Sequence, residues 1–243
     1  INVGLVGSEM CIRDSLGSAV YNFIDVGVSQ VGTDAITNAL IYKSASVTPQ
    51  GAAKFLDDTV DPTFVIGNRP SLAQTFKTGD NKVITIVVNH FRSKGGSCSG
   101  DPDIGDGQGN CNQTRVDAAT ALVNWLATDP TGSNDPDYLL IGDLNAYAKE
   151  DPVTVLKDAG YIDLIDQFTG SGAYSYVYSS QSGYLDHALA SASLSTAATG
   201  ATIWHINADE LRELDYNDSN PAEYYDPGPY RASDHDPIIV GLN

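Results

Sequence analysis

Basic residues are scarce in this chain of 243 residues. Lysine and arginine together number 13, against 31 aspartates and glutamates, so the formal net charge is −18. A protein that holds nucleic acid by charge alone would be basic, because neutralisation of phosphates drives that affinity. We interpret the acidic excess as a solvated surface. Any chemistry on a polyanion must then depend on bound cations and on a few local arginines or lysines.

Long apolar runs and a secretory leader are also missing. No stretch approaches eighteen consecutive apolar residues, so we expect no membrane span. The start lacks a basic segment, a sustained apolar run and a small-residue cleavage site, although a mature secreted chain would lack them too. Residues 1–15 follow neither helical nor strand periodicity, and we interpret them as a foreign leader, with an irregular terminus as the alternative. No linker or repeat divides the rest, so we expect one domain over residues 16–243.

Cysteines are few, and two of the three bracket one loop. Cys98 and Cys111 enclose a segment rich in glycine and aspartate with almost nothing to bury. Such a loop stays mobile unless it is closed, and a disulfide there contributes about 3 kcal/mol. We predict this disulfide, which implies an oxidising compartment and hence secretion. The alternatives are two free thiols or a calcium loop built from Asp101, Asp103 and Asp106.

The periodicity that is present alternates between strand and helix. Residues 114–128 place apolar side chains at steps of three and four, which predicts a helix, and a second short helix is expected between Pro152 and Gly160. Short apolar runs predict buried strands at residues 39–42, 83–88, 138–141 and 237–240. Strands alternating with helices indicate an α/β domain.

Clusters of polar residues stand at or near the ends of the predicted strands. They occupy residues 89–91, 142–145, 185–187 and 233–237. Open α/β sheets place their sites at the ends of strands, so we expect these clusters to meet. Three of the four histidines, His90, His187 and His235, fall within them.

These clusters contain the donors that phosphate chemistry requires. Asp143, Asn145 and Asp234 offer hard oxygen ligands of the kind that Mg²⁺, Mn²⁺ or Ca²⁺ prefers. His90 and His235 could donate protons to a phosphoryl group or accept one from water. No glycine-rich phosphate loop, zinc-ligand spacing or nucleophile elbow competes with this interpretation.

Five segments together resemble the endonuclease/exonuclease/phosphatase superfamily, and bacterial extracellular nucleases within it most closely. They are NRPSLAQTF (68–76), VVNHFRSKGGSC (87–98), GDLNAYAKEDPV (142–153), GYLDHALAS (183–191) and PYRASDHDPIIVGL (229–242). The resemblance implies a four-layer α/β/β/α sandwich that hydrolyses phosphodiesters with a divalent metal. The superfamily opens with two strands that carry an asparagine and a metal-binding glutamate. Neither motif stands before Leu16, so the resemblance implies that the N-terminal strands of the first sheet are missing.

The resemblance also implies roles for individual residues. The catalytic set is His90, Asp143, Asn145, Asp186 and His235, with Asp186 orienting His235. The metal ligands are Asp143, Asn145 and Asp234. For substrate binding we name Arg69, Asn89 and Arg92, the last with a solvated charge as the alternative. We expect His187 and His205 to be structural.

We therefore expect a secreted, monomeric phosphodiesterase that uses Mg²⁺, Mn²⁺ or Ca²⁺ to cleave DNA, with RNA as a further substrate. One alternative is a phosphoesterase of another class, such as a sphingomyelinase or an inositol-phosphate phosphatase, because one fold serves many substrates. A lipid-cleaving enzyme should expose an aromatic hairpin. No obvious one is present in the sequence, although Tyr224 and Tyr225 are a weak candidate. The second alternative is an inert fragment.

Overall fold

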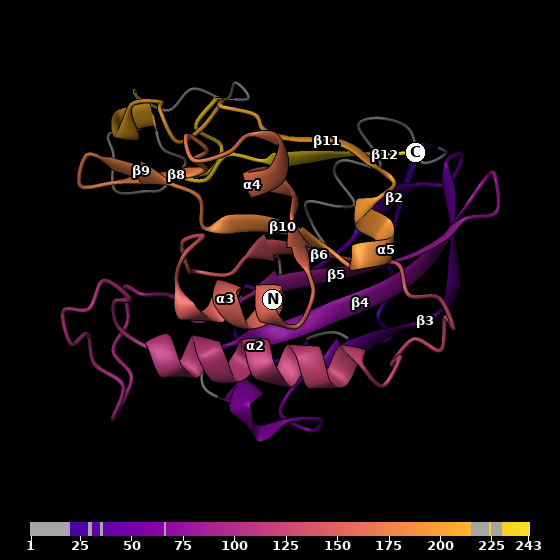
Figure 1. The fold of residues 1–243 in the computed structure, drawn as a ribbon, viewed down its shortest axis with the longest axis horizontal. Helices are drawn as coiled ribbons and strands as arrows, with labels where there is room; N and C mark the ends of the chain where they lie inside the picture. Colours follow the sequence, from indigo (N-terminus) through magenta and orange to yellow (C-terminus); the bar gives the residue numbers. More distant parts are fainter. Residues whose placement is uncertain (1–19, 29–30, 35, 66, 215–223, 225–229) are drawn as a thin grey trace.

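A six-stranded sheet forms the centre of the molecule (Figure 1). The computed structural model describes residues 20–243 apart from 29–30, 35, 66, 215–223 and 225–229. Every neighbouring pair in the sheet is antiparallel except β5 and β6, which run parallel. In spatial order the strands are β3 (Val47–Leu56), β4 (Arg69–Thr78), β5 (Val83–His90), β6 (Tyr138–Asp143), β10 (Asp186–Ala190) and β7 (Ile162–Asp163).

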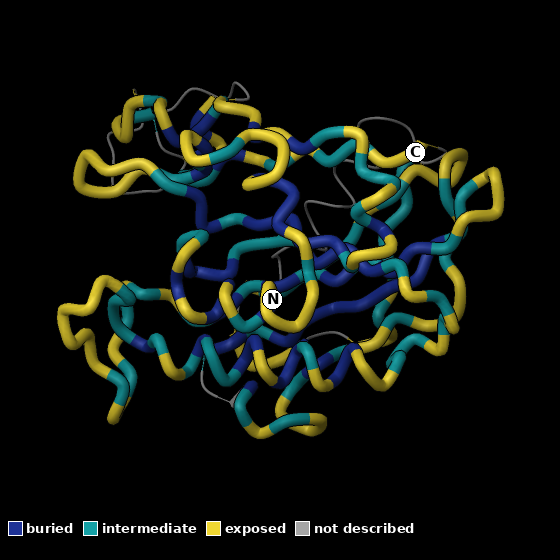
Figure 2. Tube along the Cα trace, viewed as in Figure 1, coloured by how far each residue is buried: buried dark blue, intermediate teal, exposed yellow. Residues whose placement is uncertain are grey.

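Two helices cover one face of this sheet. Helix α2 (Asn112–Leu126) connects β5 to β6, as a parallel pair of strands requires, and α3 (Asp151–Asp158) lies beside it (Figure 1). Leu122 and Trp125 of α2 and Leu156 of α3 are buried in one apolar core together with side chains of the sheet. Figure 2 shows the buried residues of the sheet and helices in dark blue. Both helices were predicted from the sequence, and α2 begins and ends two residues before the predicted bounds.

A second apolar core lies on the other face of the sheet. It combines side chains of the sheet with Leu164, Leu194 and Ile203 from elements above it. Those elements are β1 (Tyr21–Phe23), β2 (Ile41–Lys43), α4 (Leu164–Phe168), α5 (Ala192–Ser195), β11 (Ala198–Ile203) and β12 (Ile238–Leu242). The chain therefore has the layered α/β fold that the sequence predicted. The proposed leader and the expected position of the superfamily's opening strands fall on residues 1–19, outside the described residues.

The short elements complete the description. They are β8 (Tyr176–Tyr178), β9 (Gln181–Gly183) and the 3-10 turns η1 (Pro62–Val65) and η2 (Arg212–Leu214). Strand β2 starts at Ile41, two residues later than predicted, because Leu40 forms only one backbone bond to Ile24 before the ladder begins. Among the described residues no helix is both long and apolar enough to cross a membrane.

The cysteine-bounded loop is closed by the Cys98–Cys111 disulfide, with the two Cα atoms 5.4 Å apart. Within it, Asp101 caps helix α2 from a distance in sequence, because its carboxylate accepts the backbone N–H of Gln113 at 3.2 Å and that of Thr114 at 2.9 Å. Asp103 and Asp106 likewise accept backbone N–H groups two residues further along. The carboxylates of the proposed calcium loop are thus engaged in turns and a helix cap.

Candidate active site

Four of the predicted residues lie in one line across four adjacent strands. Arg69 on β4 pairs with His90 on β5, His90 pairs with Asp143 on β6, and Asp143 pairs with Asp186 on β10. Residues directly opposite each other in a sheet project from the same face. Strand register therefore brings together side chains that are far apart in the sequence.

The end of β6 is shaped so that Asp143 sits close to β5. Gly142 has φ 119°, and a Cβ atom there would lie 2.1 Å from the carbonyl oxygen of Asn89, so only glycine fits. Asn145, at φ 48°, turns back so that its backbone N–H donates to Asp143 Oδ1 at 2.7 Å. Its side-chain Nδ2 donates to Asp143 Oδ2 at 3.0 Å and to the carbonyl of Phe91 at 3.1 Å. Both carboxylate oxygens of Asp143 are therefore held by one asparagine.

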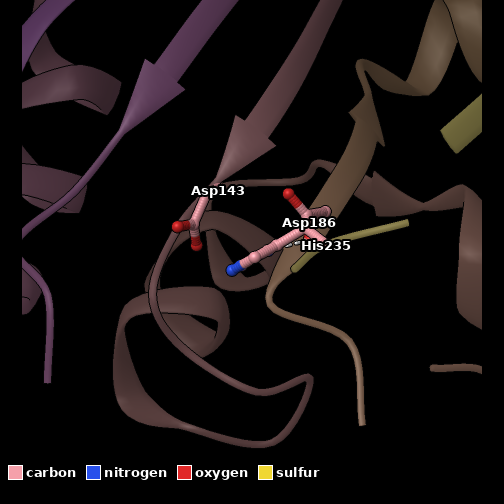
Figure 3. Close-up of side chains that lie close together, drawn as sticks. All are labelled: Asp143, Asp186 and His235. Carbon is pink, nitrogen blue, oxygen red and sulfur yellow. Dashed lines mark hydrogen bonds and ion pairs between the residues drawn. The ribbon is translucent and has the colours of Figure 1, made fainter. Parts of the chain in front are cut away.

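His235 reaches the line from the segment before β12. Its Nδ1 lies 2.7 Å from Asp186 Oδ2, which also accepts a 2.7 Å hydrogen bond from the hydroxyl of Ser175. Figure 3 shows the far ring nitrogen of His235 pointing toward the carboxylate of Asp143. Asp186 thus fixes the tautomer and the orientation of the ring, and Nε2 faces the cavity side of the sheet.

The next residue, Asp236, fixes the backbone that carries His235. Its Oδ1 accepts three backbone N–H groups, from Ile206, Asn207 and Ala208, at 2.8 to 3.1 Å. Its Oδ2 pairs with His205 Nδ1 at 2.9 Å, and its own N–H donates to the carbonyl of Ser175. The side chain of Asp236 is fully buried, so this carboxylate is a structural anchor beside the site.

The two histidines of the site differ in charge near neutral pH, because one ring is protonated and the other is neutral. Burial disfavours the charged ring of His235, but the hydrogen bond and negative charge of Asp186 outweigh it and raise the pKa of His235 to about 9. Burial, together with the positive charge of Arg69, lowers the pKa of His90 to about 4. Burial and the neighbouring charge of Asp186 raise the pKa of Asp143 to about 6. The site therefore offers one cationic ring and one neutral ring, with His90 Nε2 3.4 Å from Asp143 Oδ2.

A cavity of about 800 Å³ opens over these residues. Arg69 and Lys94, the two basic side chains at its wall, are both paired with carboxylates: Arg69 with Asp34 at 3.1 Å, and Lys94 with Glu150. Its lining includes Arg69, His90, Lys94, Asp143, Asn145, Tyr147, Tyr176, Tyr178, Gln181, Asp186, Asp234 and His235. All five predicted catalytic residues share this cavity.

Two of the predicted substrate-binding residues lie elsewhere. Asn89 is only 1% exposed and is engaged within the sheet, where it accepts from Ser71 Oγ and donates to the carbonyls of Val87 and Ile141. Arg92 is not part of the cavity wall, and its guanidinium donates to the carbonyl of Ser97. Asn89 therefore supports the strand ends, and in this structure neither side chain reaches the cavity.

The donors that could hold a divalent cation are close together. Among the described residues, Asp143, Asp186 and His235 offer ligand atoms within 4.8 Å of one another. Asp234, predicted as a ligand, lines the same cavity but lies outside this close group. Hard carboxylate oxygens suit Mg²⁺, Mn²⁺ or Ca²⁺, and a cation would favour the ionised form of Asp143, whose pKa is raised first by burial and then by the charge of Asp186. The residues present thus fit a divalent metal.

Several side chains that contribute to the site were not predicted from the sequence. Ser175 lies outside the five resembling segments, so nothing in the sequence marked it. Tyr147 lies within the 142–153 segment, but no role was predicted for it. Tyr176 and Tyr178 carry a signal that was overlooked, since tyrosines two residues apart shortly before Asp186 indicate one face of a short strand. They also correct the expectation that no obvious aromatic hairpin is present, because β8 and β9 form one with Tyr178 65% exposed.

The remaining histidines lie away from the catalytic line. His187 is a residue of β10 and is buried, with Nε2 2.8 Å from the carbonyl of Ala146 and Nδ1 3.7 Å from Asp163. His205 stacks on Tyr174 and pairs with Asp236, and it does not line the cavity.

The fold is that of a family of phosphate-ester hydrolases. The chain belongs to the Endonuclease/Exonuclease/phosphatase family, whose sequence model matches residues 52–235. The family unites nucleases and phosphatases, so at this level the protein is a phosphodiesterase or phosphatase. A comparison with curated protein sequences finds no match.

Solved structures share the fold at low sequence identity. An endonuclease/exonuclease/phosphatase family protein from Bacteroides thetaiotaomicron has TM-score 0.61 and 15% identity over 97% of this chain and 79% of its own. A mannosyl-6-phosphatase from the same organism has TM-score 0.61 and 17% identity over 98% and 82%. A 3'-5' exonuclease from Neisseria meningitidis has TM-score 0.58 and 14% identity over 95% and 83%. At these identities the similarity establishes the architecture and not the substrate.

Proposed function

We propose that the protein is a secreted, monomeric phosphodiesterase that cleaves DNA, and RNA as a further substrate, with a divalent metal. The observation that carries the proposal is the line of Arg69, His90, Asp143 and Asp186 across four strands, completed by the His235–Asp186 pair. Phosphodiester hydrolysis needs charge stabilisation at the phosphoryl oxygens and a positioned water, and these groups supply both.

The roles follow from the charge states and contacts. His235, held by Asp186 and positively charged, donates a hydrogen bond from Nε2 to a phosphoryl oxygen. Asp143 accepts a proton from the attacking water, and Asn145 keeps its carboxylate in place. His90 remains neutral beside it and adds a hydrogen bond to the phosphate.

The metal would be held at the acidic centre of the cavity. Asp143, with Asn145 and Asp234 at the same cavity, provides the oxygen ligands. When bound, the cation acts as a Lewis acid that neutralises charge on the phosphoryl group. Asp186 is engaged by Ser175 and His235, so we assign it to orientation of the ring.

A polymeric substrate and secretion are supported by separate observations. The cavity is open and about 800 Å³ in volume, with room for a nucleotide unit. The disulfide between Cys98 and Cys111 is of the kind that persists in oxidising surroundings.

Cleavage of supercoiled plasmid tests the proposal. Purified chain is incubated with Mg²⁺, Mn²⁺ or Ca²⁺, and nicked plasmid is quantified with and without EDTA. His235→Ala should reduce the rate by at least about 100-fold because it removes the positioned proton donor. His205→Ala is the matched control, since that histidine also pairs with a buried aspartate but lies outside the cavity, and its activity should stay at the unsubstituted level.

Four other results would contradict the proposal. Metal-insensitive nicking, or equal loss in both histidine variants, would reject the assigned site. Hydrolysis of mannose 6-phosphate, an inositol phosphate or sphingomyelin without plasmid nicking would assign the same site to a different substrate class. No hydrolysis of any of these phosphate esters would favour an inert chain.

A further inference from the structure

The β8–β9 hairpin presents an aromatic face beside the catalytic line. Tyr176 and Tyr178 are two residues apart on β8, so their side chains project from the same face of the hairpin. Their rings are nearly parallel, with 8° between the planes and 6.4 Å between the centroids. The ring of Tyr176 lies 4.6 Å from that of His235. The aromatic face therefore begins at a catalytic side chain and extends away from it.

Tyr147 packs against the hairpin at Gly183, and Lys94 Nζ lies 4.7 Å from the centroid of the same ring, so Tyr147 supports the aromatic face and does not extend it. Gly183 on β9 pairs with Tyr176, so a side chain at Gly183 would project from the aromatic face. A Cβ atom there would lie 2.8 Å from the ring of Tyr147, which shows that this ring lies directly over the glycine. Gln181, the partner of Tyr178, shares the same face and also lines the cavity.

The hairpin is built to face the cavity and not an apolar surface. Its turn consists of Ser179 and Ser180, both in the left-handed region, which is the conformation of a tight two-residue hairpin turn. A membrane-inserting hairpin would place apolar side chains at that tip. Here the tip is polar, while both β8 tyrosines line the cavity.

The charged side chains of the cavity bind a polyanion only weakly. Arg69, Lys94 and the cationic ring of His235 are each paired with a carboxylate, and the whole chain carries a net charge of −18. Few protein charges are therefore left to bind phosphates beyond the scissile one, and a substrate gains further affinity from stacking on exposed rings. Aromatic side chains stack on the flat faces of nucleobases, and those faces are accessible only when the base is unstacked from its neighbours.

We propose that Tyr176 and Tyr178 form a stacking wall for an unpaired nucleobase next to the scissile phosphate, which makes single-stranded nucleic acid the preferred substrate. The inference rests on the proposed nuclease function. Gln181 offers an amide that can hydrogen-bond to the edge of the stacked base. Duplex nucleic acid keeps its base faces inside the stack and gains nothing from this wall.

Binding of a labelled oligonucleotide tests the inference without requiring cleavage. Fluorescence anisotropy with fluorescein-labelled hexathymidylate is measured with Mg²⁺ in the His235→Ala background. We expect Tyr178→Ala to weaken binding about 10-fold, and Tyr178→Phe to stay within about 2-fold because the ring remains. Val177→Ala, on the same strand and 37% exposed but on the opposite face, is the matched control and should leave the Kd unchanged. Thermal melts confirm that each variant is folded, and Tyr178 is exposed enough to be removed without loss of the core.

A second probe isolates the base itself. A six-unit abasic deoxyribose-phosphate strand with the same label has the same charge, and we expect it to bind about 10-fold more weakly and to ignore Tyr178→Ala. The inference is overturned if hexathymidylate shows no saturable binding, if both strands bind equally, or if Tyr178→Ala weakens both to the same extent. It is also overturned if Tyr178→Ala abolishes binding to sphingomyelin vesicles while hexathymidylate binding is unchanged.

The two proposals can fail separately. A chain that nicks plasmid but binds hexathymidylate without regard to Tyr178 retains the nuclease function and loses the stacking wall. A chain that shows base-dependent binding but no metal-dependent cleavage retains the wall and loses the hydrolytic function.

Discussion

Asp236 should be worth several kcal/mol to the stability of the folded chain, although it lies outside the cavity. Its Oδ1 alone satisfies the backbone N–H groups of Ile206, Asn207 and Ala208. Each buried donor left without a partner costs about 1–3 kcal/mol. Because relaxation and water recover part of that sum, we expect Asp236→Ala to lower the free energy of unfolding by about 4 kcal/mol.

Asp236→Asn separates the acceptor oxygen from the charge. Asparagine keeps an Oδ1 that can accept the same three N–H groups, and its amide can donate to His205 if that ring takes the other tautomer. Only the charge assistance is lost, so we expect a cost of about 1 kcal/mol. Substitution of His205 by alanine removes a partly exposed partner and should also cost no more than about 1 kcal/mol.

The assay is thermal unfolding followed by circular dichroism at neutral pH, with EDTA present so that metal binding does not contribute. For a chain of this size, 1 kcal/mol corresponds to a Tm change of about 2–4 °C. We therefore expect a decrease of about 8–16 °C for Asp236→Ala and about 2–4 °C for Asp236→Asn. Equal decreases for the two variants would refute the reasoning, because they would show that the three N–H bonds contribute little and that the charge dominates.

Three further changes probe other parts of the structure. Replacing Cys98 and Cys111 by serine should cost about 3 kcal/mol, since the disulfide closes a short loop and restricts the unfolded chain, and urea unfolding measures this. The amide donors of helix α2 outweigh the effect of burial and lower the pKa of Asp101, so its contribution to stability is present above the unfolded pKa and lost as pH falls through the folded pKa. Asp101→Asn should therefore lose less stability than the unsubstituted chain between pH 5 and pH 2, and parallel acid titrations would contradict this expectation. Gly142→Ala places a Cβ atom 2.1 Å from the Asn89 carbonyl oxygen, so it should separate β5 from β6 and reduce plasmid nicking by at least about 10-fold, whereas unchanged nicking would show that the strand ends tolerate the displacement.

The sequence predicted those parts of the fold that depend on local patterns. Helices α2 and α3 and strands β5 and β6 follow directly from apolar periodicity and from the turn residues that bound them. The layered α/β class followed from their alternation together with the family resemblance. Short strands such as β8 and β9 were not predicted, because three residues are too few to show a period and their stability comes from pairing.

The site residues were predicted from sequence motifs. The residues that were not predicted share one physical feature, which is that their roles arise from tertiary contacts. Asp143 and His235 belong to recognisable segments, so they could be named before any geometry was known. Ser175 binds the catalytic line through one hydroxyl, and Tyr147 enters the cavity because Gly183 leaves space for its ring. Such roles arise from tertiary proximity, which a single sequence does not display. Asn89 shows the converse, since it stands beside His90 in a motif but alternation along β5 places its side chain within the sheet.

The acidic excess and the catalytic site are two consequences of the same composition. A net charge of −18 disfavours the approach of a polyanion, and the carboxylates Asp34 and Glu150 pair with the arginine and lysine of the cavity wall. Crowded carboxylates nevertheless create a site for a divalent cation, and they raise the pKa of His235 so that one proton donor stays charged. Affinity for phosphate then depends on the cation and on the ring of His235. Selectivity among phosphate esters depends on uncharged side chains that contact the rest of the substrate. The tyrosines beside His235 are the neutral groups in that position, which is why substrate preference is expected to follow the hairpin and not the net charge.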